Sequence, residues 1–394
     1  MHYLIIGNGV AGTTAAGEIR KHDSAGEITI FSSEALPFYS RIRLVEYLAG
    51  DISDQDLVLF KKEWYESHSI SLMLSSQVQS IEPQYSRIIL ADGSSRTYDR
   101  LLIASGGIPL IPKLDGVSLP FVLPLRTYED ARRIRAALPN CSAVTVLGGG
   151  LLGIETAEAL RRTGKSVTVI ETFPRLLPRQ LDAAGAAILL EMLQKRGLTF
   201  VLPARAAGIV DAPHDRGIEL EDGRFIKTEM VVLSAGMLPN VALAEALPIR
   251  HGRGIQVNDR LETETPRIYA AGDVAEHRGM TYGIWPAAEE QGRIAGVNMS
   301  GGEETYEGTL PATTLKVAGI SLVSAGEIDP DGKHRSLVTS LPDRGVYRKI
   351  VVDGETVIGC ILFGDMTGRK ALLNAVAKKQ HVNELDANII ELKG

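Results

Sequence analysis

Short apolar runs alternate along this chain with longer segments rich in alanine and glutamate. The runs 3–6 and 144–147 are typical of buried parallel strands, and a segment with the composition of a helix follows each of them. Between strand and helix lie two glycine-rich turns, Gly7-Asn8-Gly9-Val10-Ala11-Gly12 and Gly148-Gly149-Gly150-Leu151-Leu152-Gly153. This repeated order of strand, turn and helix predicts an α/β fold.

The glycine spacing predicts that each turn binds a dinucleotide. The chain has to turn tightly, let its backbone approach a pyrophosphate, and begin a helix whose N-terminal amides face the anion, and glycine permits all three. A single GxGxxG pattern arises often by chance, but both copies here follow a strand and precede a helix. We therefore expect two Rossmann-like dinucleotide-binding domains.

The second strand of each half is expected to end in a group that binds the adenosine ribose. In the second half this group is Glu171, whose carboxylate would accept hydrogen bonds from a ribose 2′-hydroxyl and repel a 2′-phosphate. That position predicts a preference for NADH over NADPH; the alternative is a solvated acid at a strand end. In the first half Ser32 takes the equivalent place, and Glu34 is the nearby acid.

Two dinucleotide folds in one chain resemble the FAD-dependent pyridine nucleotide-disulfide oxidoreductase superfamily, in which FAD occupies the first site and NAD(P)H the second. Segments 101–107 and 231–240 are similar to the crossovers between its two domains. Segment 265–274 is similar to its second FAD signature, in which an aspartate holds the ribityl chain. Asp273 takes that position, and a simple helix cap is the alternative.

Further segments narrow the resemblance to NADH:rubredoxin reductases and the flavin module of NAD(P)H nitrite reductases. These segments are 36–44, 47–50, 285–293 and 313–317. The redox-active cysteine pair of the disulfide reductases and the single cysteine of the water-forming NADH oxidases are both missing, since Cys141 and Cys360 lie far apart in apolar surroundings. Glu46 stands where the dioxygenase ferredoxin reductases carry a lysine, which argues against that partner.

The resemblance also implies which residues hold the cofactors. For FAD they are Gly7, Gly9, Val10, Ala11, Gly12, Ser33, Glu34, Arg41, Val78, Ala104, Ser105, Gly106, Gly272, Asp273 and Trp285. For NADH they are Gly148, Gly150, Leu151, Leu152, Gly153, Glu171, Ala235 and Gly236. Trp285 is alternatively an ordinary core residue.

Three further positions are expected to act at the flavin. Glu155 is similar to a helix-borne acid that positions the nicotinamide and is the expected catalytic residue; the alternative is an acid that complements the helix dipole. A helix that opens at Pro286 would point free amides at the flavin and stabilise negative charge on its reduced ring. Arg41 is favoured over Arg43 to add positive charge there, with a surface cation as the alternative for Arg43.

The order of segments predicts nested domains. We expect an FAD-binding domain from 1–110 and 240–308, an NAD-binding domain from 111–239, and a small α+β C-terminal interface domain from 309–394. Alternating apolar positions at 347–352 and 356–363, broken by Asp353-Gly354, predict a hairpin in that last domain, followed by a helix at about 368–379.

Composition excludes several other classes of function. The chain has 394 residues, of which 44% are hydrophobic and 23% charged, and a net charge of −6, which argues against nucleic acid and membrane surfaces. The first strand begins too early for a signal peptide and no apolar run is long enough to span a bilayer, so a cytoplasmic protein is expected. The eight histidines lack metal-ligand spacing, so no metal is expected.

These observations predict an NADH-dependent FAD enzyme that passes electrons to a small redox protein such as rubredoxin or to a nitrite reductase component. Two alternatives stay open: an NADH oxidase that forms hydrogen peroxide, and a flavin-bearing subunit or NADH sensor. Whether the C-terminal domain binds a partner protein or forms a homodimer is also open. Such carriers are commonly acidic, so basic residues are candidates for docking: Arg126, Arg132, Arg133, Arg135, Arg348, Lys349, Lys378 and Lys379.

Overall fold

The chain folds into two compact units, each assembled from three separate stretches of sequence. The computed structural model describes residues 1–212, 215–245, 247, 249–317, 319–386 and 389. The first unit comprises 1–43, 52–108 and 237–309, and the second comprises 44–51, 109–236 and 310–394. Residues 318, 387–388 and 390–394 of the predicted C-terminal domain lie outside the described residues. The domain boundaries drawn from the sequence stay a prediction.

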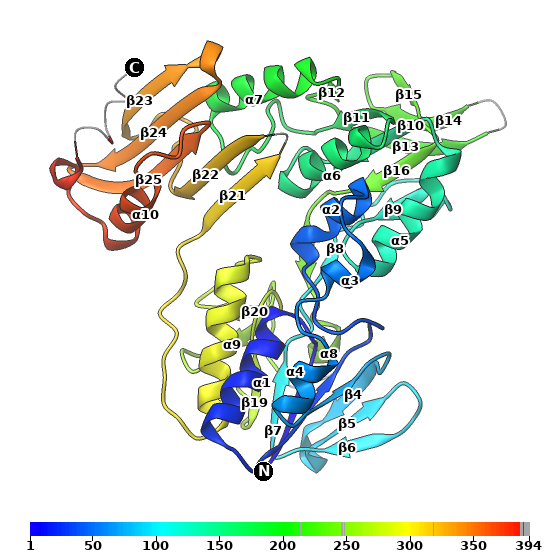
Figure 1. Ribbon diagram of the computed structural model, residues 1–394, viewed down its shortest axis with the longest axis vertical. Helices are drawn as coiled ribbons and strands as arrows, with labels where there is room; N and C mark the ends of the chain where they lie inside the picture. Colours follow the sequence, from blue (N-terminus) through cyan, green and yellow to red (C-terminus); the bar gives the residue numbers. More distant parts are fainter. Residues whose placement is uncertain (213–214, 246, 248, 318, 387–388, 390–394) are drawn as a thin grey trace. The chain divides into compact units, whose positions relative to one another are not determined.

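A parallel sheet of five strands forms the centre of the first unit. Its order is β19 (Ile268–Ala270), β7 (Arg100–Ile103), β1 (His2–Ile6), β2 (Glu27–Phe31) and β3 (Ile70–Met73) (Figure 1). Helices α1 (Val10–His22) and α9 (Trp285–Met299) pack against each other. Both faces of β1 are buried, because its alternate residues belong to two different apolar clusters. This explains the unbroken apolar run in the sequence.

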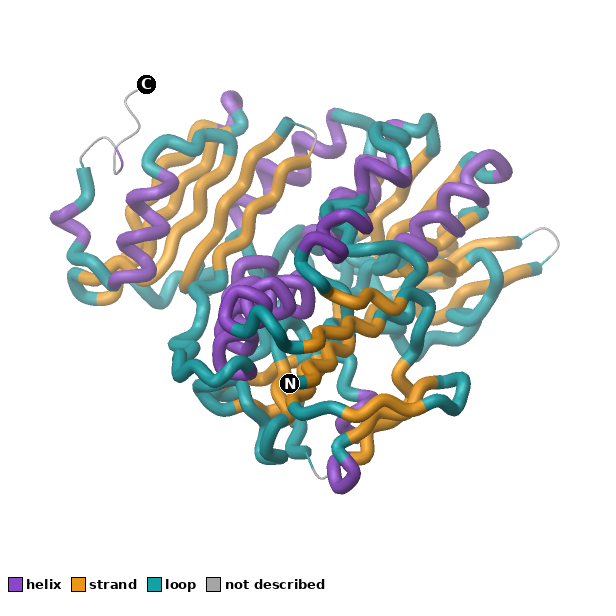
Figure 2. The backbone as a smooth tube through the Cα atoms, turned by 60° about the horizontal axis from the view of Figure 1, so that its bottom comes forward, coloured by secondary structure: helices purple, strands orange, loops and turns teal. Residues whose placement is uncertain are grey.

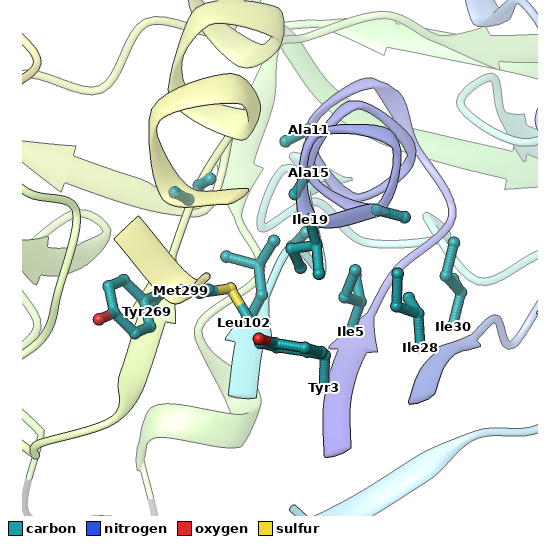
Figure 3. Close-up of a cluster of buried hydrophobic side chains, with 14 of the residues drawn as sticks. Tyr3, Ile5, Ala11, Ala15, Ile19, Ile28, Ile30, Leu102, Tyr269 and Met299 are labelled. Atoms are coloured by element: carbon teal, nitrogen blue, oxygen red, sulfur yellow. The ribbon is translucent and has the colours of Figure 1, made fainter. Parts of the chain in front are cut away.

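The core beside this sheet contains both short and long apolar side chains. Ile19 of α1 points toward the strands that carry Ile5 and Ile28, while Ala11 and Ala15 lie on the side of α1 that faces α9 (Figure 3). Ala15 and Ile19 are fully buried. The alanines allow α1 and α9 to approach closely, so that the backbone at Ala11 and Ala15 lies against Gly292 and Gly296 of α9.

Smaller elements complete the first unit. An antiparallel sheet contains β4 (Val78–Glu82), β5 (Arg87–Leu90) and β6 (Ser95–Thr97). Two strand pairs are β18 (Ile255–Val257) with β20 (Ala275–His277), and β8 (Gly107–Pro109) with β17 (Met237–Pro239). The short helices are α3 (Asp54–Leu57), α4 (Lys62–Ser67) and α8 (Ala242–Glu245).

The second unit repeats the parallel arrangement. Its sheet has the order β12 (Thr199–Val201), β11 (Ser166–Ile170), β10 (Ala143–Leu147), β16 (Met230–Leu233) and β9 (Val122–Pro124). Its helices are α5 (Tyr128–Ala137), α6 (Leu151–Arg162) and α7 (Ala183–Lys195), and β13 (Ala206–Asp211), β14 (Arg216–Leu220) and β15 (Phe225–Lys227) form a separate antiparallel sheet.

One segment of the first half of the sequence belongs to this second unit. Helix α2 (Leu44–Ala49) packs against α5 and α6. The guanidinium of Arg162 donates two hydrogen bonds to the carboxylate of Asp51, at 2.6 and 2.7 Å, and Arg135 lies over the Tyr47 ring at 4.6 Å. Residues 44–51 therefore pack with α6, the helix that begins at the second glycine-rich turn, and with α5.

The C-terminal part of the second unit is a five-stranded antiparallel sheet. Its order is β21 (Ala312–Val317), β22 (Ile320–Gly326), β25 (Thr356–Phe363), β24 (Val346–Asp353) and β23 (Arg335–Leu341), and α10 (Arg369–Lys378) packs on β25 and β22 (Figure 2). The hairpin predicted around Asp353-Gly354 is confirmed, with Gly354 at a φ of +58°. Among the described residues, no helix is both long and apolar enough to cross a membrane.

Two residues expected on a docking surface lie instead in the core. Arg348 and Lys349 of β24 are only 1% and 5% exposed. They were selected for their charge, but β24 is an inner strand of its sheet. The hydroxyl of Tyr347, two residues before Lys349, reaches Asp182 at the start of α7, while Arg348 donates to the carbonyl of Thr367 beside α10. Side chains on both faces of the strand are therefore covered, and the prediction for these two residues was wrong.

The contact between α1 and α9 can be tested with two glycines. A Cβ on Gly292 would lie 2.4 Å from the carbonyl oxygen of Ala11, whereas a Cβ on Gly17 has only the Trp64 ring, at 3.8 Å. We expect Gly292→Ala to destabilise the protein by about 1–3 kcal/mol through overpacking. Gly17→Ala should be neutral or stabilise by up to about 1 kcal/mol. Chemical denaturation of both variants measures this; equal effects would contradict the helix contact.

Candidate functional site

The first glycine-rich turn packs tightly against backbone atoms at Gly7 and Gly12 and is open at Gly9. Gly7 has a φ of +112°, and a Cβ there would lie 2.1 Å from the carbonyl oxygen of Ala104. A Cβ on Gly12 would lie 2.0 Å from the carbonyl oxygen of Gly7. Gly9, in contrast, has only Arg41 Nη1 near its Cβ position, at 3.8 Å. The turn therefore leaves room for a ligand at Gly9, with a guanidinium beside it.

Buried polar groups without partners face this turn region. Within the part of the chain that the structure describes, Arg41 Nε and Asn8 Nδ2 have no hydrogen-bond partner. Arg41 also forms an ion pair with Glu34, whose carboxylate accepts from the Tyr39 hydroxyl as well. Buried donors that lack acceptors are costly unless a ligand supplies them. These donors fit the phosphates and sugar of a dinucleotide.

The second FAD signature meets the same turn from another strand. Gly272 follows β19 at a φ of +83°, and a Cβ there would lie 3.0 Å from the Ala11 Cβ. Its amide donates to Gln291 Oε1 at 2.8 Å, and Gln291 Nε2 is a further buried donor for which the described residues supply no acceptor. Sequence reasoning missed Asn8 and Gln291, although both lie inside quoted motifs. Their residue types alone gave no sign of burial.

The remaining residues expected at FAD occupy different environments. Ser33 is exposed, Val78 is buried at the start of β4, and Ser105 donates to the carbonyl of Asn240 at 2.9 Å. Trp285, the first residue of α9, lies 5.8 Å from the Phe38 ring. Helix α9 thus begins one residue before Pro286, and its first turn still carries the predicted proline. The assignment of these residues to FAD stays a prediction.

The second glycine-rich turn repeats the geometry of the first. Gly148 has a φ of +118°, and its Cβ would lie 2.3 Å from the carbonyl oxygen of Ser234; a Cβ on Gly153 would lie 2.0 Å from the Gly148 oxygen. Nothing lies within 4 Å of the Cβ position at Gly150, the first residue before α6. Ala235 and Gly236 follow β16 beside Ser234. The start of α6 therefore has the same open geometry as the start of α1, which suits an anion.

Glu171 is held rigidly beside this turn. Its Oε2 accepts from the Gly149 amide at 2.7 Å and its Oε1 from the Phe173 amide at 2.8 Å, and the side chain is 6% exposed. Each carboxylate oxygen keeps a lone pair for a ribose hydroxyl. Phe173, which sequence reasoning did not select, is 56% exposed beside it. Leu151, Leu152 and Glu155 lie on the first turns of α6 and are partly buried.

Burial raises the pKa of three side chains in the second unit, those of Glu155, Cys141 and Cys360. Burial raises the pKa of Glu155 to about 7, so this carboxyl changes charge near neutral pH. Cys141 and Cys360 are free and buried, and burial raises the pKa of the Cys360 thiol to about 12. Neither cysteine is a reactive thiolate. The described residues contain no group of three or more histidine, cysteine or acidic side chains that could hold a metal.

Comparison with known proteins shows the family. Residues 1–292 match the model of the pyridine nucleotide-disulphide oxidoreductases, and residues 311–380 match the rubredoxin NAD+ reductase C-terminal domain. The chain is 32% identical over 394 residues to the NADH-rubredoxin oxidoreductase of Clostridium acetobutylicum, covering 98% of this chain and 97% of that protein. The crystal structure of NADH:rubredoxin oxidoreductase from that organism superimposes with a TM-score of 0.84 at 29% identity, covering 99% and 98% of the two chains.

Other relatives are longer. The chain is 35% identical over 383 residues to the nitrite reductase [NAD(P)H] of Bacillus subtilis, covering 97% of this chain and 48% of the relative. It also covers 51% of the assimilatory nitrate reductase electron transfer subunit of that organism. The chain thus spans about half the length of these two relatives.

Together the two turns and the matches define a flavoprotein class with paired dinucleotide-binding folds. The chain belongs to the pyridine nucleotide-disulphide oxidoreductase family and has the α/β fold predicted for it. Family membership agrees with the predicted cofactors, FAD and NADH. The buried donors at Asn8 and Arg41 and the open glycines fit these groups.

The raised pKa of Glu155 predicts a pH-dependent loss of stability. The unfolded chain releases this proton near its ordinary pKa of 4.5, whereas the folded chain keeps it up to about 7. Between these values the folded state binds more protons, so stability falls as the pH rises. The Glu155→Gln variant lacks this titration. We expect the difference in the free energy of unfolding between Glu155→Gln and the native protein to shift in favour of the variant by about 1–2 kcal/mol from pH 5 to pH 8.

Thermal unfolding of the FAD-loaded proteins at several pH values measures this difference. The exposed Glu221→Gln variant is the control for loss of one surface carboxyl. A pH-independent difference between Glu155→Gln and the native protein would show that the carboxyl is not desolvated.

Proposed function

We propose that this protein takes hydride from NADH on its FAD and passes electrons to a small redox protein or to a nitrite reductase component. The observation that carries the proposal is that two dinucleotide turns occur together with buried, unreactive Cys141 and Cys360. The described residues offer no redox disulfide that the flavin could reduce. The electrons of a bound flavin would therefore pass to an acceptor beyond these residues.

In the first unit, the chain's own groups hold FAD and compensate its charge. Gly9 and the α1 amides receive the pyrophosphate, and Arg41, which lies next to Gly9, adds a positive charge. Glu34 orients Arg41 and accepts from the ribose. The first turn of α9 carries Pro286, so its free amides stabilise negative charge on the reduced ring. FAD, when bound, supplies the conversion of a two-electron donor to one-electron transfers.

In the second unit, NADH is held by its adenosine half and positioned by Glu155. Gly150 and the α6 amides bind the pyrophosphate, and Glu171 binds the ribose. Glu155 lies one turn further along α6. Its carboxylate form, present above pH 7, favours the positively charged oxidised nicotinamide. This role makes Glu155 the residue that responds to pH near neutrality.

The C-terminal domain supports an acidic carrier as acceptor. Helix α10 contains three basic residues and no acidic one, and Lys379 follows it directly. Arg369, Lys370, Lys378 and Lys379 are exposed and form no ion pair with any described residue. By contrast, Arg132 is paired with Glu129, and Arg135 lies on Tyr47. The relatives named for rubredoxin and for nitrite reductase support the same acceptor classes.

The acceptor can be identified by following reoxidation of the flavin. The yellow protein is reduced anaerobically with NADH and then mixed with oxidised rubredoxin or with air. We expect rubredoxin to reoxidise the flavin at least about tenfold faster than air, because charge complementarity speeds encounter. In the Lys378→Glu, Lys379→Glu variant, reoxidation by rubredoxin should slow while reoxidation by air stays unchanged.

Equal rates with rubredoxin and air would contradict the carrier proposal. A hydrogen-peroxide-forming NADH oxidase would then be the better description. A relative from Methanocaldococcus jannaschii that is 31% identical over 341 residues is named NADH oxidase. A reduced complex that neither acceptor reoxidises would point to the flavin-bearing subunit or sensor.

The preference for NADH over NADPH can be tested at Glu171. Removing its charge takes away both the ribose acceptor and the repulsion of a 2′-phosphate. We expect Glu171→Arg to raise the Kd for NADH by about tenfold or more and to lower the Kd for NADPH. Glu171→Gln, whose single amide oxygen can accept from only one of the Gly149 and Phe173 amides, adds no positive charge and should weaken NADH less. Flavin reduction at a series of concentrations of each nucleotide measures both constants, and unchanged values would remove Glu171 from the ribose site.

A further inference from the structure

The segment between Glu171 and α7 folds back onto the second glycine-rich turn. The amide of Leu177 donates to the carbonyl oxygen of Gly149 at 3.1 Å, and a Cβ on Gly149 would lie 2.8 Å from the Leu176 side chain. Leu176 and Leu177 are fully buried. Because the Gly149 amide is bound by Glu171, both polar groups of this residue's backbone are taken. The 172–181 segment therefore helps to set how Gly149 and Gly150 are presented to a ligand.

This segment is under backbone strain and is held in place by several hydrogen bonds. Leu177 has a φ of +50°, a left-handed conformation that costs a leucine free energy. Its carbonyl accepts from the amides of Gln180 and Leu181, each at 2.9 Å. Arg175 Nε donates to the carbonyl of Leu181 at 3.2 Å. A strained residue persists only when its surroundings determine its conformation. The end of the segment, at Leu181, is thus coupled to Gly149.

Asp182 follows directly and anchors the segment to the C-terminal sheet. Its Oδ1 caps α7 by accepting from the Gly185 amide at 3.0 Å. Its Oδ2 accepts from the Tyr347 hydroxyl at 2.6 Å and lies 3.2 Å from Lys349 Nζ, and all three side chains are buried. Lys349 Nζ also donates to the carbonyl of Asp329 at 2.7 Å. One carboxylate oxygen of Asp182 therefore binds α7, and the other binds side chains of β24.

A helix cap alone does not account for this arrangement. Capping uses only Oδ1, and an exposed serine or asparagine would serve equally well. A buried ion pair is no better for stability than apolar residues of the same size, but it fixes one relative position of the groups that it joins. Burial and the Asp182 carboxylate both raise the pKa of the Tyr347 hydroxyl, so it remains a donor at all physiological pH values.

We infer that Asp182, held by Tyr347 and Lys349, is a positioning residue for the nucleotide site, through which the C-terminal domain sets the affinity for NADH. The inference rests on the proposed binding of NADH at Gly150 and Glu171. Contacts run without a gap from β24 through Asp182, Leu181 and Leu177 to Gly149. Coupling is reciprocal, so NADH binding also acts on the C-terminal domain.

The test uses FAD-loaded protein and anaerobic stopped-flow reduction by NADH, which separates the Kd for NADH from the limiting rate of flavin reduction. Tyr347→Phe removes one hydroxyl and keeps the ring and the cap on Gly185. We expect it to raise the Kd for NADH about fivefold and to leave the limiting rate and the FAD content unchanged. Asp182→Asn, which keeps the cap and removes the charge pair, should raise the Kd as well.

Tyr3→Phe is the matched control, because the Tyr3 hydroxyl donates to Asp23 Oδ2 at 2.9 Å and the residue is 1% exposed in the first unit. It should leave the Kd for NADH unchanged. Arg175→Met probes the same coupling inside the segment. Combined with Tyr347→Phe, it should raise the Kd little more than the stronger single change, because both act through Leu181.

Three results would overturn the inference. An unchanged Kd in Tyr347→Phe and Asp182→Asn, with a raised Kd in Glu171→Arg, would reject the link and leave the nucleotide site standing. An unchanged Kd in Glu171→Arg would instead reject the site assignment on which the link rests. Equal increases in Tyr347→Phe and Tyr3→Phe would show a loss of general stability rather than positioning.

Discussion

The close approach of backbone to backbone at two glycine turns is the constraint on which the rest of this structure depends. A Cβ atom at Gly7 would lie 2.1 Å from the carbonyl oxygen of Ala104, which follows the parallel neighbour strand β7. A Cβ atom at Gly148 would lie 2.3 Å from that of Ser234, which follows β16. At Gly12 and Gly153 it would lie 2.0 Å from the oxygen of the first glycine. No other residue fits these four positions. Because glycine occupies these positions, each turn can connect its strand to its helix within a few residues, and the first amides of the helix stay free of intrahelical partners.

The two sites differ in how their acids are held, and this difference has a chemical consequence. Glu171 accepts from the amides of Gly149 and Phe173, so its position is set by the backbone. Glu34 is bound by a guanidinium and a phenol, both on side chains of the 39–41 segment. Under the proposed function, a charge fixed by amides would discriminate between nucleotides, since it could not move away from a 2′-phosphate. A charge neutralised by Arg41 would tolerate an anionic pyrophosphate nearby.

Local features of this chain could be predicted from the sequence. The glycine turns, the strand runs before them and the Asp353-Gly354 hairpin depend on backbone conformation or on residues that are neighbours in sequence. The absence of a reactive cysteine pair was also visible, because it needs only residue types and spacing. Burial was harder to predict. Arginine and lysine are typical surface residues, yet Arg348 and Lys349 are buried because elements distant in sequence cover both faces of β24.

Several residues of the candidate site could not be found from local sequence features, because their role depends on burial and on contacts with distant residues. Asn8 and Gln291 are significant because their amide nitrogens are buried without an acceptor among the described residues, a property of packing. The contact between Asp182 and Tyr347 joins residues far apart in the chain. The sequence by itself determined the two dinucleotide folds and the lack of a redox-active cysteine pair, because glycine geometry and cysteine content are local. Only the tertiary structure decided which charges are buried and which segments hold the turns in place, because desolvation and hydrogen-bond partners come from distant residues.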